Sequence, residues 1–110
     1  MRNKYHARRE SIDGYLFGSR AEAARYRELK LLERAGQISM LRVHPRYEII
    51  INEQKICIVE ADFEFYDEQQ ERTRVIDVKG MDLALSRLKR KLVKVLYAID
   101  IEIEKVRRSR

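Results

Sequence analysis

The 110-residue sequence has little cysteine, proline and glycine, and it has no long hydrophobic segment. Its single cysteine, Cys57, allows no internal disulfide, which favours a reducing compartment. One proline and four glycines exclude a fibrous or linker-like chain. No apolar segment approaches the ~20 residues that span a bilayer, and the basic N-terminal segment lacks the apolar stretch of a secretory signal. We therefore expect a cytoplasmic protein with no membrane contact.

Basic residues outnumber acidic ones, and the excess lies at the two ends of the chain. The formal net charge is +6. Residues 1–36 hold 9 basic and 5 acidic residues, residues 37–80 hold 6 and 9, and residues 81–110 hold 9 and 4. This distribution fits a protein that holds nucleic acid by its flanks and presents carboxylates, with or without a metal, at its middle. A sheet with solvated acidic edges would give the same counts.

Hydrophobic residues make up 45% of the sequence, enough for one buried core, so residues 1–110 are predicted to form a single domain. A loosely structured basic arm is expected over 1–17, and a basic tail over 107–110. Residues 19–35 predict a helix, because alanine, glutamate, arginine and leucine dominate them and Gly36 follows as a stop. Its apolar face is expected to comprise Ala21, Ala24, Leu31, Leu32 and Ala35.

The remaining elements are predicted from their hydrophobic periodicity. Residues 47–51, 55–66 and 73–79 predict strands, the last two as an antiparallel hairpin, whereas residues 38–43 are ambiguous. Asp82 is expected to cap a helix to residue 97, and residues 99–103 predict a last strand. The apolar positions of that helix are Leu85, Leu88, Leu92 and Leu96. The order α-β-β-β-α-β predicts an α+β fold, an α/β sandwich.

Asp77 and Lys79 form the first pattern that could carry chemistry. A strand places residues two apart on one face, so their carboxylate and ammonium groups should lie together. A solvent-exposed ion pair of little energetic value is the simpler interpretation. Asp62, on the preceding predicted strand, can lie beside Asp77 in the hairpin. Two adjacent carboxylates repel unless a cation lies between them, and such a cation could act on a phosphodiester.

Glu22 is the candidate third acid, and two interpretations of it remain. Ser19 and Glu22 match a Ser-x-x-Glu capping box, in which each side chain binds a backbone N–H of the other. Glu22 also borders the apolar face of the predicted helix, where its side chain could turn toward a neighbouring sheet. The local pattern favours the cap, and the two roles are compatible.

These acids, in this order, resemble the PD-(D/E)xK nuclease superfamily. A closer similarity, over roughly residues 4–106, links the chain to a small phage and prophage family of unknown function near Holliday-junction resolvases. The segments that carry it are Phe17-x-Ser19-Arg20-x-Glu22-Ala23, Leu29-Lys30-Leu31-Leu32-Glu33-x-Ala35-Gly36-x-Ile38, Ala61-Asp62-Phe63 and Asp77-Val78-Lys79-Gly80. The resemblance implies a restriction-endonuclease-like core, with a mixed central sheet flanked by helices.

The resemblance also implies a function. It implies a metal-dependent DNA endonuclease in a bacterial host, with Glu22, Asp62 and Asp77 around Mg²⁺ or Mn²⁺ and Lys79 at the attacking water. Branched DNA of the Holliday-junction type is the expected substrate, and a homodimer would supply two active sites. Ala61 stands where the superfamily name has proline. His44 lies where related sequences often carry glutamine. It could line the site or contact a phosphate, and our default interpretation is a loop residue.

Basic residues on the second helix and in the arm could neutralise phosphates without reading base sequence. They are Arg87, Arg90, Lys91 and Lys94 on the helix, and Lys4, Arg8 and Arg9 in the arm. A solvated helix face is the alternative. With two histidines and one cysteine, a structural zinc site is not expected. The alternative functions are a non-catalytic DNA-binding module and a phage replication or recombination accessory protein.

Overall fold

Two helices and eight strands make up residues 9–106, the part of the chain that the computed structural model describes. The predicted α+β fold is confirmed. The helices are α1 (Arg20–Arg34) and α2 (Ala84–Tyr97). The strands are β1 (Glu10–Ile12), β2 (Tyr15–Phe17), β3 (Ile38–Val43), β4 (Arg46–Ile51), β5 (Gln54–Glu60), β6 (Phe63–Asp67), β7 (Arg72–Lys79) and β8 (Ile101–Lys105).

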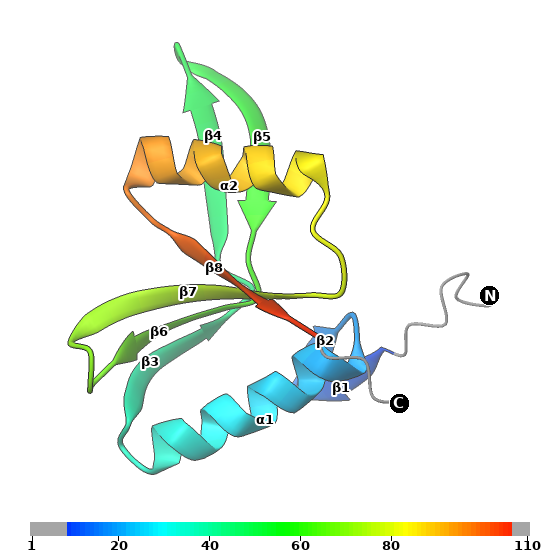
Figure 1. The fold of residues 1–110 in the computed structure, drawn as a ribbon, viewed down its shortest axis with the longest axis vertical. Helices are drawn as coiled ribbons and strands as arrows, with labels where there is room; N and C mark the ends of the chain where they lie inside the picture. The colour runs from blue at the N-terminus through cyan, green and yellow to red at the C-terminus, as the bar shows by residue number, and fades with distance from the viewer. Residues whose placement is uncertain (1–8, 107–110) are drawn as a thin grey trace.

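A four-stranded sheet in the order β3-β6-β7-β8 forms the centre of the fold (Figure 1). Strands β3, β6 and β7 are antiparallel neighbours, whereas β8 returns through α2 and lies parallel to β7. The sheet is therefore mixed, as expected. The predicted strands 47–51 and 73–79 are β4 and β7, but the predicted order of helix, three strands, helix and strand omits β1, β2 and β3 and takes β5 and β6 as one strand.

Helix α1 begins and ends close to the predicted residues. The Ser19 hydroxyl accepts a hydrogen bond from the Glu22 backbone N–H at 3.1 Å, and Gly36 has the positive φ of 77° expected after a helix. The predicted apolar face is wrong at its centre, because Ala23, Tyr26 and Leu29 are the buried residues. These three side chains pack on the sheet, so the buried stripe includes the tyrosine and leaves Leu31 exposed.

The predicted loose arm is wrong for residues 10–17. They form the antiparallel hairpin β1–β2, with Asp13 and Gly14 at the turn. Phe17 at its end is fully buried against α1 and the sheet, and this burial explains why the segment is ordered. Residues 1–8 of the predicted arm and the predicted basic tail, 107–110, lie outside the described residues.

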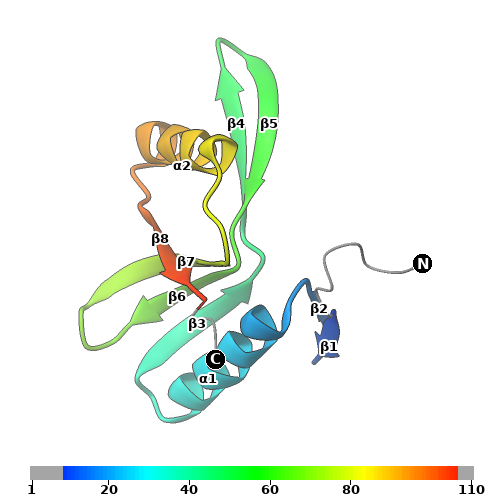
Figure 2. The same cartoon turned by 45° about the vertical axis from the view of Figure 1, so that its right-hand side comes forward.

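The single strand predicted over 55–66 is also wrong, because the chain changes partners at Ala61 and Asp62. Residues before this point form β5, which pairs with β4 in a hairpin that projects from the sheet (Figure 2). Residues after it form β6, which lies between β3 and β7 and makes the predicted antiparallel hairpin with β7. The Ala61 N–H donates to the Pro45 carbonyl at 3.0 Å, and the Asp62 N–H donates to the Ile76 carbonyl at 3.2 Å.

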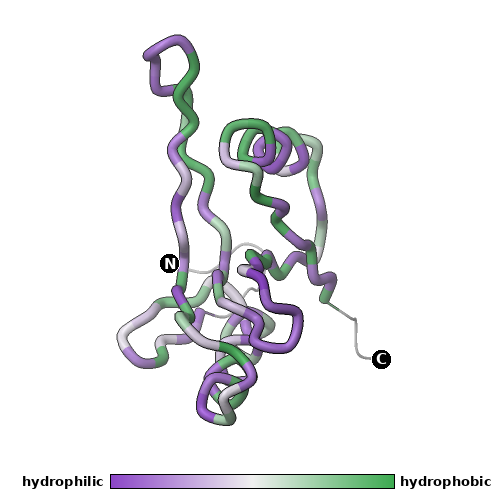
Figure 3. The backbone as a smooth tube through the Cα atoms, turned by 90° about the vertical axis from the view of Figure 1, so that its left-hand side faces the viewer, coloured by the Kyte–Doolittle hydropathy of each residue, from purple (hydrophilic) through white to green (hydrophobic). Residues whose placement is uncertain are grey.

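Helix α2 differs most from its prediction. Asp82 does not cap it; the N-cap is Leu83, which makes no side-chain capping bond. Of the predicted apolar positions, Leu85, Leu88 and Leu96 are exposed, and Val93 is the residue buried against β4, β5 and the sheet. Hydrophobic and hydrophilic residues alternate around α2 and along the projecting hairpin (Figure 3). Neither helix of residues 9–106 is long and apolar enough to cross a membrane.

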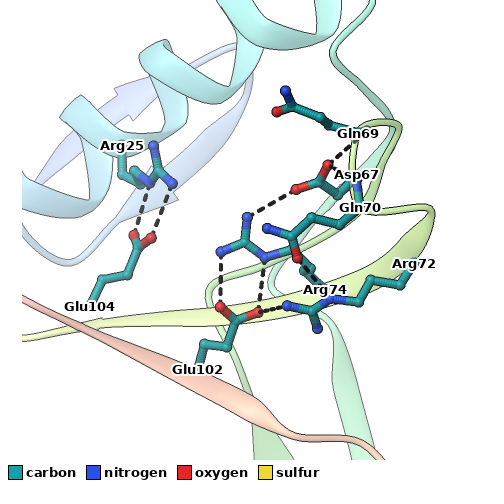
Figure 4. Close-up of polar contacts among 8 residues, drawn as sticks. All are labelled: Arg25, Asp67, Gln69, Gln70, Arg72, Arg74, Glu102 and Glu104. Carbon is teal, nitrogen blue, oxygen red and sulfur yellow. Dashed lines mark hydrogen bonds and ion pairs between the residues drawn. The ribbon is translucent and has the colours of Figure 1, made fainter.

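An ion network fastens β8 to its neighbours on the side of the sheet that faces α1 (Figure 4). The Arg74 guanidinium on β7 donates to both carboxylate oxygens of Glu102 on β8, at 2.8 and 3.0 Å, and to Asp67 Oδ2 at 3.1 Å. Arg25 on α1 donates to both oxygens of Glu104 at 2.8 and 3.0 Å. Bidentate arginine–carboxylate pairs of this kind fix the relative orientation of the two side chains as well as their distance.

Replacing Arg74 with alanine should lower the free energy of unfolding by about 2–3 kcal/mol, because Asp67 and Glu102 would remain partly buried without their cation. Urea denaturation followed by circular dichroism measures this loss. Arg72→Ala is the matched control, since the Arg72 side chain is mostly exposed and lies 3.9 Å from Glu102. Equal losses for the two variants would contradict a structural role specific to Arg74.

Candidate active site

Four segments that carry candidate residues meet at one end of the sheet. In the antiparallel arrangement of β3, β6 and β7, the end of β3, the start of β6 and the end of β7 lie at the same end of the sheet. Helix α1 runs from this end toward the opposite one, and β3 runs back, so the first turn of α1 also lies at this end (Figure 1). His44, Asp62, Asp77 and Glu22 come from these four segments.

Asp62 lies at the centre of the group. Its Oδ2 accepts a hydrogen bond from the Val78 backbone N–H at 2.7 Å, and one of its carboxyl oxygens lies within 4.8 Å of a Glu22 carboxyl oxygen. Burial, followed by the interaction with the neighbouring Glu22 carboxyl group, raises the pKa of Asp62 to about 9. A carboxyl group with this pKa is protonated at neutral pH unless a cation replaces the proton.

Asp77 and Lys79 lie on one face of β7, as the spacing predicts. The Lys79 ammonium is 3.4 Å from Asp77 Oδ2, and both side chains are mostly buried rather than solvent-exposed. Burial raises the pKa of Asp77, while the ammonium group of Lys79 opposes that shift. The simpler interpretation of a surface ion pair is therefore wrong.

Glu22 combines the two interpretations left open by its sequence. Its backbone N–H takes part in the Ser19 cap, whereas its carboxyl group has an oxygen within 4.8 Å of the Asp62 carboxyl group. Among residues 9–106, no hydrogen bond joins the Glu22 side chain to the Ser19 backbone N–H, so only half of the capping box is present. The carboxyl group is thereby free to face the sheet.

His44 lies in the junction between β3 and β4, as our default interpretation of a loop residue expects, and its imidazole also lies near two of the candidate acids. One ligand atom each from His44, Glu22 and Asp62 lie within 4.8 Å of one another. Asp77 is not in this group of three, but its charge interacts with the Asp62 carboxyl group. The group of three offers two carboxyl groups and one imidazole, and carboxylate and imidazole ligands suit a divalent metal ion.

A groove between β5, β7 and α2 contains Asp77 and Lys79 but none of Glu22, His44 and Asp62. Besides Asp77 and Lys79, its lining includes Glu60, Lys89 and Arg90. Lys89 was not among the predicted DNA-binding residues, because it lies off the stripe chosen on the helix. Two more cations in the groove provide positive charge beside the acids.

The predicted DNA-binding residues of α2 are not equivalent. Arg90 donates to both oxygens of Asp82 at 2.7 and 2.8 Å and is only 17% exposed, and Arg87 donates to the Asp82 carbonyl. Lys91 and Lys94 are exposed, and Lys94 pairs with Asp100. In the predicted arm Arg9 is exposed, whereas Lys4 and Arg8 lie outside the described residues.

Gly18 leaves space for the Glu22 carboxylate. A Cβ atom built on Gly18 would lie 3.0 Å from Glu22 Oε2, the end of a flexible side chain that can move away. We expect Gly18→Ala to preserve folding but to weaken divalent-metal binding by about tenfold, because Glu22 would shift from its place beside Asp62. Isothermal titration calorimetry measures the affinity, and Gly80→Ala, where an added Cβ meets nothing within 4 Å, is the control. Unchanged affinity in Gly18→Ala would exclude Glu22 from the metal site.

Comparison with known proteins gives one match. The model of a family described as "Protein of unknown function (DUF1064)" matches residues 2–110. No curated protein and no solved structure matches the chain.

Proposed function

We propose a function on the premise that the chain belongs to the DUF1064 family, whose model spans nearly all of it. The chain is a metal-dependent DNA endonuclease that hydrolyses phosphodiester bonds, with branched DNA as its substrate. Glu22, Asp62 and Asp77 hold the metal ion, and Lys79 acts on the attacking water. The resemblance of these residues to the PD-(D/E)xK pattern supports the proposal.

The observation that carries the proposal is the grouping of partly buried carboxyl groups. Asp62 lies beside Glu22, with ligand atoms within 4.8 Å of each other, and interacts with the charge of Asp77, which is itself buried and pairs with the ammonium group of Lys79. Partial burial of three neighbouring acids is costly unless protons or a cation compensate their charge. The donor set is rich in oxygen, which is what Mg²⁺ and Mn²⁺ prefer. The residues therefore fit the proposed metal.

The bound metal would supply Lewis-acid stabilisation of the phosphate and a more acidic bound water. The side chains of the protein supply the geometry. The Val78 N–H fixes one oxygen of Asp62, and Lys79 holds Asp77 while its ammonium group remains beside the groove. An ammonium group in this position can orient a water molecule and stabilise the negative charge that grows on the phosphate.

The groove provides the route for a DNA strand. Lys79 and Lys89 line it beside Asp77, and a backbone phosphate that enters would exchange its counterions for these cations. The proposal assigns no base recognition, because phosphate contacts carry no sequence information. Branched DNA and a homodimer with two active sites remain parts of the proposal that come from the resemblance alone.

Cleavage of labelled DNA tests the proposed function. Four-way junction, flap and linear duplex substrates are incubated with the wild-type protein and Mg²⁺, Mn²⁺ or EDTA. We expect metal-dependent cutting, with branched DNA cut faster than duplex, and no cutting in EDTA. Binding of DNA without cutting, with every substrate and metal, would instead favour the non-catalytic DNA-binding module.

A further inference from the structure

His44 is the one residue of the cluster whose ligand atom is nitrogen. Its imidazole lies with the carboxylates of Glu22 and Asp62, each with one ligand atom within 4.8 Å of the others. The three residues come from the β3–β4 junction, the first turn of α1 and the β5–β6 junction. A metal bound at this place would take two oxygen ligands and one nitrogen ligand from these three residues, in addition to the Asp77 carboxylate of the proposed site.

The backbone holds His44 and Asp62 in a fixed relation. The His44 N–H donates to the Asp62 carbonyl at 2.9 Å. A second bond joins their neighbours, because the Ala61 N–H donates to the Pro45 carbonyl at 3.0 Å. The imidazole ring also packs against the buried Phe17 ring, with centroids 5.7 Å apart. The imidazole is therefore positioned before any ligand arrives, which reduces the ordering that binding must impose.

We propose that His44 is a metal ligand, together with Glu22 and Asp62, and that it gives the site a preference for Mn²⁺ over Mg²⁺. The inference rests on the proposed function, since it concerns the metal of that same site. Imidazole binds first-row transition metals well, whereas Mg²⁺ prefers oxygen ligands and retains its waters. Asp62 belongs to the His44 group and also interacts with the charge of Asp77, so the metal lies beside the Asp77–Lys79 pair.

Electron spin-echo spectroscopy of the Mn²⁺-loaded protein tests the proposal, because it detects a nitrogen nucleus bound to the metal. We expect ¹⁴N modulation in the wild type and its loss in His44→Asn. Asparagine tolerates the positive φ of 55° at this position, and His44→Gly, which removes the ring and accepts the same φ, is a second variant. The matched control is His6→Asn, which alters the other histidine of the chain.

Equilibrium titration with each metal gives the second measurement. The Mn²⁺ dissociation constant should rise by about tenfold or more in both His44 variants, while that of Mg²⁺ changes little. If the Mn²⁺-loaded wild type shows no nitrogen modulation and both His44 variants bind Mn²⁺ with wild-type affinity, the role of His44 is overturned and the proposed nuclease is left intact. Failure of the wild type to bind either metal would overturn both. Loss of modulation in His6→Asn alone would assign the nitrogen to His6 and also overturn the proposal.

Discussion

Asp77→Asn and Lys79→Met should each reduce metal-dependent DNA cleavage by about 1000-fold or more while leaving DNA binding intact. Asparagine preserves the shape of Asp77 but removes the charge that faces Lys79 and the metal. Methionine preserves most of the Lys79 side chain but removes the ammonium group that faces the groove. Loss of one group that stabilises a transition state commonly costs about 10²–10³ in rate, and loss of a metal ligand costs at least as much.

Single-turnover cleavage of the preferred substrate and a gel-shift measurement of affinity separate catalysis from binding. Asp100→Asn and Lys55→Met are the matched controls, since both side chains are more than half exposed and lie in other ion pairs. We expect both controls to cut at the wild-type rate. Cleavage by Asp77→Asn or Lys79→Met at a rate near that of the wild type would remove that residue from the active site.

Asp62→Asn should stabilise the metal-free protein, although it removes a ligand of the proposed metal site. Burial and the neighbouring acid raise the pKa of Asp62 from 3.8 to about 9, so the folded protein retains a proton that the unfolded chain releases. The contribution of Asp62 to stability is therefore fully present below pH ~4 and is lost as the pH rises toward 9. One retained proton corresponds to a decrease of at most about 1.4 kcal/mol per pH unit.

Thermal unfolding in EDTA between pH 5 and pH 9 measures this effect. The melting temperature of the wild type should fall as the pH rises, whereas that of Asp62→Asn should change less and exceed it by about 10 °C at pH 8. The asparagine oxygen can still accept the Val78 N–H bond. Added Mn²⁺ should stabilise the wild type and the Asp100→Asn control but not Asp62→Asn. A lower melting temperature for Asp62→Asn at pH 8 would contradict the cost assigned to the buried carboxyl group.

The parts of the fold that local patterns control were predictable from the sequence. The helix after Ser19 follows from its cap and composition, and the antiparallel pairing of β6 with β7 follows from alternation and a polar connection. The shared face of Asp77 and Lys79 follows from the two-residue repeat of a strand. Each of these features depends on neighbours in the sequence.

Other features depend on residues far apart in the chain. Alternation of side chains continues through Ala61 and Asp62, so nothing local shows that β5 pairs with β4 and β6 with β3. His44 reaches Asp62 only because of this change of partner. The leucines of α2 form a regular stripe, yet the sheet and hairpin bury Val93 instead. The conformation of His44 was not predictable either, since a residue before proline is usually extended, whereas His44 has a φ of 55°.

Strand β8 gives the chain an order of assembly. Strands β3, β6 and β7 precede β8 in the chain, and the whole of α2 separates β7 from β8. Because the ribosome makes β8 after its neighbours, β8 should be the last strand to join. Until it does, β7 has an open edge, and Arg25 and Arg74 lack the carboxylates of Glu104 and Glu102. During synthesis, a ribosome must therefore release Ile101–Lys105 from its exit tunnel before β7, the strand that carries Asp77 and Lys79, is held on both sides.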